Sequence, residues 1–263
     1  MTFAQHSCMR YVNLFCRRIG QDHHDVRAPG QTVERALPGD IREQIKTRER
    51  VRDLAEVYTH RREVDAMLDL VPDMFPGTVA EVAFKFLEPA CGSGNFLVEV
   101  LRRKLEPIQF SLMPDPEQYE HWLLRAMASV YGVDICAENV VETKRRLLDT
   151  LHWHYFNDTG ACDTTPSFAR GVKAVLDTNI LHADMLAQAP TTEVVEYLPG
   201  QNGTFTREWS LLDGSAALAH SPSLFDQVDE PKRDAVPIHY SCLSDYPAPT
   251  QPGDRAASRA KVA

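Results

Sequence analysis

The chain has 263 residues, of which 43% are hydrophobic, and it carries a net charge of −9 at pH 7. This length predicts one medium-sized domain with tails, and no apolar run approaches the roughly 20 residues that a membrane span needs. The negative charge argues against a large DNA footprint on this chain alone, because DNA binding takes much of its affinity from phosphate neutralisation.

The domain organisation is expected to be a core with flanking segments. Residues 1–40 are polar and irregular, and residues 41–76 form a helical segment that precedes the core. We expect the core domain at residues 77–240, with an insertion at about residues 190–224. Residues 241–263 are rich in proline and small residues, so we expect a disordered tail there.

A glycine-rich turn follows the first expected strand of the core. A short apolar run ends in Glu88, and Gly92 and Gly94 then precede a helix-forming segment. Glycines can adopt positive φ and lie close to a ligand, and the amides at the start of the helix point toward it. A dinucleotide fingerprint wants a third glycine at position 97, where this chain has Leu97. The pattern therefore favours an adenosyl cofactor over a nicotinamide dinucleotide, with a plain structural turn as the alternative.

Two further expected strands also end in an acid. Residues 129–135 include Asp134, and residues 178–186 include Asp184, with helical patterns between the strands. Ligands of open parallel sheets bind at the carboxyl ends of strands, where these acids lie. Asp134 is placed to accept hydrogen bonds from ribose hydroxyls, and Asp184 from an adenine amino group. A capping or turn acid is the alternative interpretation of each.

These motifs resemble those of adenine-N6 DNA methyltransferases of bacterial restriction–modification systems. Glu-Pro-Ala-Cys-Gly-Ser-Gly-Asn-Phe-Leu at residues 88–97 is similar to the first motif of that family. Tyr-Gly-Val-Asp-Ile at residues 131–135 is similar to the second, and His-Ala-Asp-Met-Leu at residues 182–186 to the third. The helical run at residues 50–72 resembles the segment that precedes the first motif.

The resemblance implies an α/β fold with a Rossmann-like, S-adenosylmethionine-dependent methyltransferase sheet, and DNA as a partner. It implies S-adenosyl-L-methionine as the cofactor. In the family, a Thr-Pro pair helps to hold the methionine end of the cofactor, and this chain has Thr59-His60 there. The cofactor-binding residues that the resemblance implies are Glu88, Pro89, Ala90, Gly92, Gly94, Asn95, Phe96, Asp134, Ile135, Asp184, Met185 and Thr59.

The catalytic loop of the family, Asp/Asn-Pro-Pro-Tyr/Phe, is absent from the sequence. The nearest pieces, at residues 229–232 and 245–248, lack the double proline with a following aromatic and read as turns or linkers. Phe225-Asp226 resembles the start of the family's fourth strand, and residues 235–240 resemble sequence that follows the loop. We therefore expect that a segment with the fourth strand and its loop has been lost, and we name no catalytic residue.

A sheet that keeps only its first three strands is a partial fold. Its first strand, normally central, is expected to have an exposed edge, which predicts marginal stability or association with a partner protein. The resemblance implies a site-specific adenine DNA methyltransferase that is inactive alone. The alternatives are a non-catalytic cofactor-binding or interaction module that works with a partner chain, and a methyltransferase that acts on RNA or protein.

Cysteines and basic residues give weaker signals. The six cysteines form no Cys-x-x-Cys pair, so we expect neither a metal site nor a disulfide framework, and reduced thiols fit a cytoplasmic location. Lys144, Arg145 and Arg146 are consecutive on an expected helix. A solvated helix face is one interpretation of this basic cluster, and a DNA contact is the other.

Overall fold

The computed structural model describes residues 59–75, 77–79, 82, 84–161, 164–212 and 232–246. The expectations for residues 1–40, for most of the helical segment and for the end of the tail lie outside these residues. The described helices are α3 (Arg61–Leu68), η2 (Pro72–Met74), α4 (Asn95–Leu105), η4 (Phe110–Leu112), α5 (Pro116–Ala128), α6 (Ala137–Thr159), α7 (Pro166–Asn179), η5 (Ala189–Thr191) and η6 (Tyr240–Asp245). None of these helices combines the length and the apolar character that are needed to cross a membrane.

The first sheet is parallel and consists of β1 (Phe86–Glu88), β2 (Val130–Asp134) and β3 (Ile180–His182) in that spatial order. Phe86 is paired with Val130, and Gly132 of the central strand with Ile180. The chain is thus mixed α/β with a three-stranded parallel sheet, compatible with part of a Rossmann-like fold. As expected, β1 is an edge strand among the described residues, since it pairs with β2 alone.

Helix boundaries follow local sequence signals. Asp115 and Thr165 are the N-caps of α5 and α7, and each accepts a hydrogen bond from a backbone amide of the first turn. A proline follows each cap at the first helical position, where its missing N–H costs nothing. Helix α6 ends at Thr159, and its C-cap residue Gly160 has a φ of +71°, a conformation that favours glycine.

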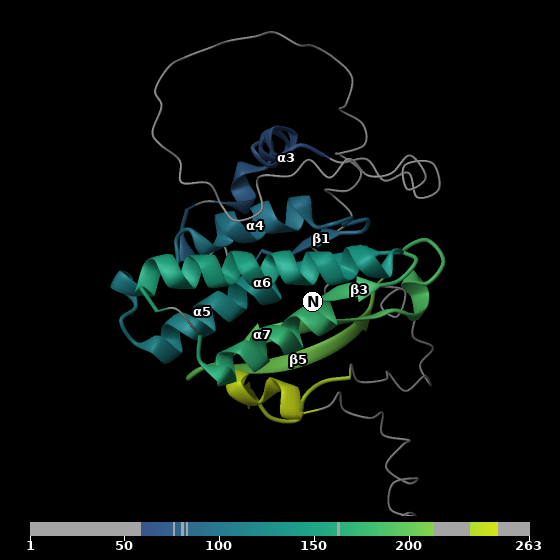
Figure 1. The fold of residues 1–263 in the computed structure, drawn as a ribbon. Coiled ribbons are helices and arrows are strands. Elements are labelled where there is room, and N and C mark those ends of the chain that lie inside the picture. Colours follow the sequence, from purple (N-terminus) through teal and green to yellow (C-terminus); the bar gives the residue numbers. More distant parts are fainter. Residues whose placement is uncertain are drawn as a thin grey trace, which may run out of the picture.

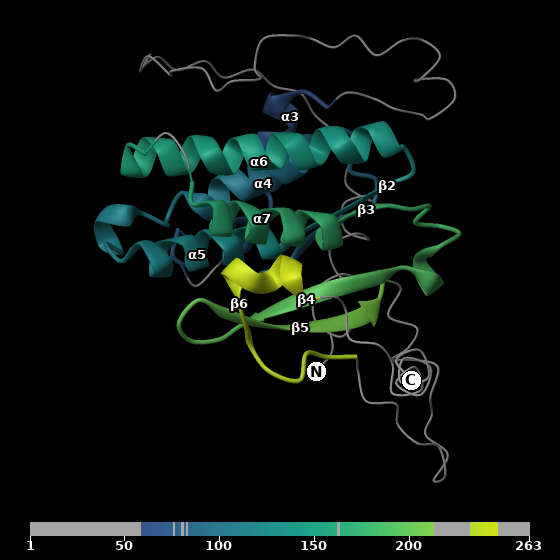
Figure 2. The same ribbon diagram turned by 60° about the horizontal axis from the view of Figure 1, so that its bottom comes forward.

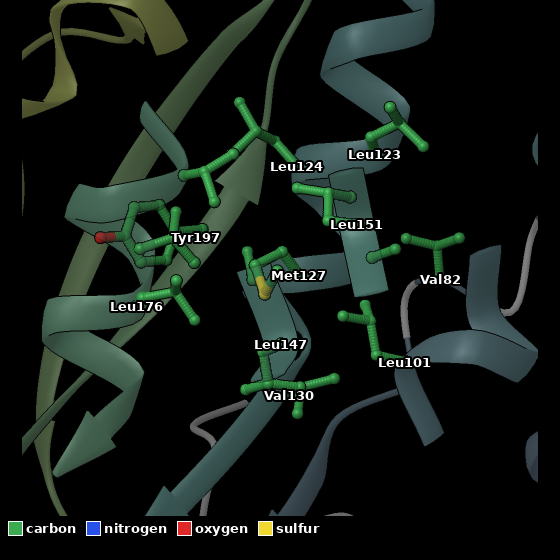
Figure 3. Packing of buried hydrophobic residues seen from close by; sticks show 14 of the residues in the cluster. Val82, Leu101, Leu123, Leu124, Met127, Val130, Leu147, Leu151, Leu176 and Tyr197 are labelled. Carbon is green, nitrogen blue, oxygen red and sulfur yellow. The ribbon is translucent and has the colours of Figure 1, made fainter. Parts of the chain in front are cut away.

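The main hydrophobic core lies between the parallel sheet and the helices. Figure 3 shows Leu147 and Leu151 of α6 beside Met127, Val130 and Leu101. A Cβ at position 132 would lie 2.6 Å from Cδ1 of Leu97, so glycine there allows Leu97 to pack closely on the central strand. Leu97 is fully buried, so the residue that replaces the third glycine of a dinucleotide fingerprint packs α4 onto β2.

The second sheet is antiparallel and contains β4 (Glu193–Pro199), β5 (Thr204–Leu211) and β6 (Ile238–His239) in the order β4-β5-β6. It lies on the side of α7 that faces away from α6 (Figures 1 and 2). Most of the expected insertion is therefore a hairpin with its own place in the fold. Its turn is at Asn202-Gly203, as the sequence predicts, and both residues have positive φ.

The two sheets are joined by side chains of β2. Tyr131 donates a hydrogen bond of 3.0 Å to the carbonyl oxygen of Val195 in β4. Val133 lies in a small buried cluster with Val194 and Leu212. The hairpin thus contributes apolar cover to the parallel sheet, although none of its strands joins that sheet.

The tail boundary differs from the expectation. The sequence predicts a disordered tail over residues 241–263, yet Tyr240–Asp245 forms the helix η6. Tyr240 and Leu243 are buried, and a Cβ on Gly171 of α7 would lie 2.8 Å from the carbonyl oxygen of Tyr240. This close packing against α7 could not be foreseen, because the motifs that carry the resemblance stop at Tyr240. Residues 247–263 lie outside the described part of the chain.

Candidate functional site

The glycine turn lies between β1 and α4, at the carboxyl edge of the parallel sheet (Figure 1). Gly92 has a φ of +54° and Gly94 a φ of +85°. A Cβ on Gly94 would lie 2.8 Å from Oγ1 of Thr143, whereas no atom lies within 4 Å of a Cβ built on Gly92. Both turn glycines therefore have the backbone conformation that the sequence predicts, and the space beside Gly92 is open.

Asp134 fastens this turn to the central strand. It is 8% exposed, and its Oδ2 accepts a hydrogen bond of 2.7 Å from the amide of Gly92. Its Oδ1 accepts from the amide of Cys136 at 2.8 Å and from Nδ2 of Asn139 at 3.2 Å. A carboxylate has about four acceptor positions, and the described residues fill three of those of Asp134. The turn-acid interpretation and the ligand interpretation are thus compatible.

Glu88 is the acid with the most unusual environment at this edge. Burial raises the pKa of its carboxyl to about 7, partly offset by a hydrogen bond from the amide of Ala90. That bond is long, at 3.5 Å, and no cationic side chain pairs with Glu88 among the described residues. A ligand ammonium or hydroxyl at Glu88 would supply the partner that the carboxylate lacks.

The raised pKa of Glu88 predicts how stability depends on pH. Between its ordinary pKa of 4.5 and its folded pKa of about 7, the folded chain binds more protons than the unfolded chain, so stability falls as pH rises. Glu88→Gln removes this loss, and its free energy of unfolding should exceed that of the unmodified chain by about 3 kcal/mol above pH 7. Urea denaturation at pH 5 and pH 8 measures the difference. Glu106→Gln, a change on a side chain that is 73% exposed, is the control and should gain less stability at pH 8 than Glu88→Gln.

Asp184 lies just after β3 at the same edge and shapes a turn. Its Oδ1 accepts hydrogen bonds from the amides of Leu186 and Ala187, at 2.9 and 3.1 Å. Its Oδ2 has no partner among the described residues. The side chains of Ile135 and Leu186 are 59% and 96% exposed, so two apolar groups follow the ends of β2 and β3. An apolar ring with a polar rim fits such a place.

Other sequence-predicted residues take supporting positions. Nδ2 of Asn95 donates to the carbonyl oxygen of Thr59 at 3.1 Å, so Thr59 does lie beside the turn. Phe96 packs partly buried against the main core, and Met185 against the smaller cluster. Pro89 is partly buried and Ala90 is exposed within the turn. The structure thus brings Thr59 next to the turn and places both Phe96 and Met185 against the core.

Helix α6 supports the glycine turn through two side chains, Thr143 and Arg146, that the sequence analysis did not identify as site residues. Oγ1 of Thr143 donates to the carbonyl oxygen of Gly92 at 3.0 Å, and Nη1 of Arg146 donates to that of Ser93 at 2.6 Å. Together with Asn139, these residues follow a three- and four-residue spacing, which places them on one helix face. That spacing was the available signal, and it was obscured by the run of basic residues.

The three consecutive basic residues of α6 all form ion pairs or hydrogen bonds within the protein. Nζ of Lys144 lies 3.0 Å from Oδ1 of Asp177, and Arg145 pairs with Glu142 and Asp149 of its own helix. Arg146 points to the glycine turn. These pairings favour the helix-face interpretation over a DNA contact for this cluster.

Comparison of the chain with protein-family models, with curated proteins and with solved structures finds no match in any of the three. The functional class of this protein therefore depends on the geometry of the site at the carboxyl edge of the parallel sheet. That site consists of a turn with two positive-φ glycines, the N-terminus of α4, and acids at the ends of three neighbouring parallel strands.

Proposed function

We propose that this chain binds S-adenosyl-L-methionine at the carboxyl edge of its parallel sheet. In this proposal the chain is the cofactor-binding part of an adenine-specific DNA methyltransferase of a restriction–modification system, with a partial Rossmann-like sheet. The observation that carries the proposal is that Glu88, Asp134 and Asp184 lie at the carboxyl ends of three neighbouring parallel strands, where Asp134 also binds the glycine turn.

Each part of the cofactor has a counterpart in the site. The remaining acceptor position of Asp134 suits a ribose hydroxyl, and Oδ2 of Asp184 suits the adenine amino group, while the exposed side chains of Ile135 and Leu186 offer apolar surface at the same sheet edge. Glu88 offers a carboxylate to the ammonium group of the methionine part. A cationic ligand suits a site with three acids, because each carboxylate gains from an opposite charge nearby.

The chain's residues bind and orient in this proposal, and none of them receives the base. When bound, S-adenosyl-L-methionine supplies an electrophilic methyl group on its sulfonium. Transfer to an adenine amine also needs hydrogen-bond acceptors for that amine and a ring that stacks on the extruded base. The tetrapeptide that does this in the resembling family is absent from the sequence, so we propose that the chain is inactive alone.

A non-catalytic module that works with a partner chain is the second candidate. The edge position of β1 favours it, because strand β1 has a neighbour on one side alone among the described residues. A partner that supplies the base-binding loop would complete the site from that side. A methyltransferase acting on RNA or protein is a third candidate, and no contact in the site favours it.

Calorimetric titration followed by a transfer assay tests the proposal. S-adenosyl-L-methionine should bind the unmodified chain, and Asp134→Ala should weaken binding at least about tenfold, because it removes a ribose acceptor and the tether of Gly92. Asp177→Ala, a change to an acid that pairs with Lys144 and Lys173 away from the site, should bind as the unmodified chain does. No binding by the unmodified chain would refute the proposal.

The transfer assay uses the cofactor with a labelled methyl group and duplex DNA that contains adenine. The pure chain should transfer no label even when it is saturated with cofactor. Transfer by the pure chain would support an adenine methyltransferase and would contradict the proposed need for a partner.

A further inference from the structure

We infer that Arg146 is the positioning residue of this site, because it holds the glycine turn directly and holds Thr59 through Asn95. One guanidinium nitrogen, Nη1, donates to two acceptors at once. It lies 2.6 Å from the carbonyl oxygen of Ser93 and 2.7 Å from Oδ1 of Asn95. The part of this inference that concerns the cofactor rests on the proposed function, and the part that concerns the turn does not.

Arg146 fixes the orientation of the Asn95 amide. A guanidinium has donors and no acceptor, so the group of Asn95 that faces it must be the oxygen Oδ1. The NH2 group of Asn95 then points the other way, and Nδ2 donates to the carbonyl oxygen of Thr59 at 3.1 Å. One cation on α6 thereby orients the amide that binds the carbonyl of Thr59, two residues before α3.

The turn is held from one side by three groups of β2 and α6. Asp134 accepts from the amide of Gly92, Thr143 donates to the carbonyl of Gly92, and Arg146 donates to the carbonyl of Ser93. These contacts satisfy the turn's backbone groups on the protein side and leave open space beside Gly92. A turn that is already held in its binding conformation loses less entropy when a ligand arrives.

The neighbouring Arg145 offers a matched control. Its side chain is 58% exposed and pairs with Glu142 and Asp149 on its own helix. Arg145→Met therefore removes the same charge and the same donors as Arg146→Met, one position away, without touching the turn. In both variants methionine keeps an apolar stem of similar length.

Hydrogen exchange of the turn amides tests the inference without any ligand. The amide of Gly92 is bonded to Asp134 and that of Gly94 to the carbonyl oxygen of Cys91. Arg146→Met should accelerate exchange at both amides at least about tenfold, as expected for the loss of charge-assisted hydrogen bonds. Arg145→Met should leave exchange unchanged, and Arg146→Lys should restore part of the protection. Equal exchange in Arg146→Met and the unmodified chain would overturn the inference.

Two further measurements keep the inference falsifiable. Asn95→Asp keeps an acceptor for Arg146 but replaces the donor to Thr59 by an oxygen, so exchange should accelerate at residues 59–64 and not at Gly92. Titration with S-adenosyl-L-methionine should show about tenfold weaker binding for Arg146→Met and unchanged binding for Arg145→Met. If the unmodified chain binds no cofactor, the proposed function and the cofactor part of the inference fail together, and the exchange result alone decides the role of Arg146 in the turn.

Discussion

Replacement of Asp234 by alanine should lower the free energy of unfolding by about 3–5 kcal/mol, because it leaves a buried cation without its counterion. Asp234 and Arg207 of β5 are each 6% exposed at the side chain. The guanidinium donates Nε to Oδ2 at 2.9 Å and Nη2 to Oδ1 at 3.0 Å. Oδ2 also accepts from the amide of Arg207, so the carboxylate anchors both the side chain and the strand.

The adjacent ion pair is the natural control for this prediction. Arg233 pairs with Glu208 across the same two segments, but its side chain is 53% exposed. Arg233→Ala should therefore cost less than about 1 kcal/mol, as exposed pairs do. Urea denaturation followed by circular dichroism measures both variants. A loss for Asp234→Ala that is no larger than that for Arg233→Ala would show that the buried pair is not a major stabilising contact.

Gly94→Ala should destabilise the chain by about 2–5 kcal/mol and abolish cofactor binding. Two separate costs add up at this position. A positive φ costs a residue with a Cβ about 1–2 kcal/mol, and the new methyl group would lie 2.8 Å from Oγ1 and 2.9 Å from Cγ2 of Thr143. Forced overpacking of this kind typically costs about 1–3 kcal/mol. Thermal denaturation and calorimetric titration measure the two effects.

Two variants separate these costs. Gly160, the C-cap of α6, has a φ of +71°, and no atom lies within 4 Å of a Cβ built there. Gly160→Ala therefore carries the conformational cost alone and should leave cofactor binding intact. Thr143→Ala loses its hydrogen bond to Gly92 in either background, so it should destabilise Gly94→Ala less than it destabilises the unmodified chain. An equal loss in both backgrounds would show that the overlap with Thr143 does not limit the turn.

The parallel sheet could be predicted because its signals are local. Each strand ends in an acid within a few residues of a turn or helix start, and the glycines at positions 92 and 94 specify the first turn. The order of the strands along the chain is also their order in the sheet. The position of the acids at the strand ends could be predicted from the sequence. The second role of Asp134, which is to bind the amide of Gly92, could not, because it depends on a contact between residues 42 positions apart.

The antiparallel sheet could not be predicted because its determinants are pairs of distant residues. The charged stretch at residues 227–234 has little strand character, and it lies where we expect the fourth strand and its loop to be lost. In the structure, Lys232, Arg233 and Asp234 each meet an opposite charge on β4 or β5. Complementary charges 25 or more residues apart leave no periodic signal, so only the folded chain reveals that residues 232–234 dock on the hairpin.

The buried pair also sets an order for folding. Asp234 follows Arg207 by 27 residues, and Tyr246, whose carbonyl oxygen accepts from Nη1 of Arg207, follows it by 39. During synthesis from the N-terminus, all three strands of the parallel sheet emerge before these partners exist. The cofactor edge can therefore assemble while β5 still carries an unpaired cation, and the hairpin can close its interior only when the last described residues have left the ribosome. The order of synthesis therefore makes the second sheet the last part of the described chain to be completed.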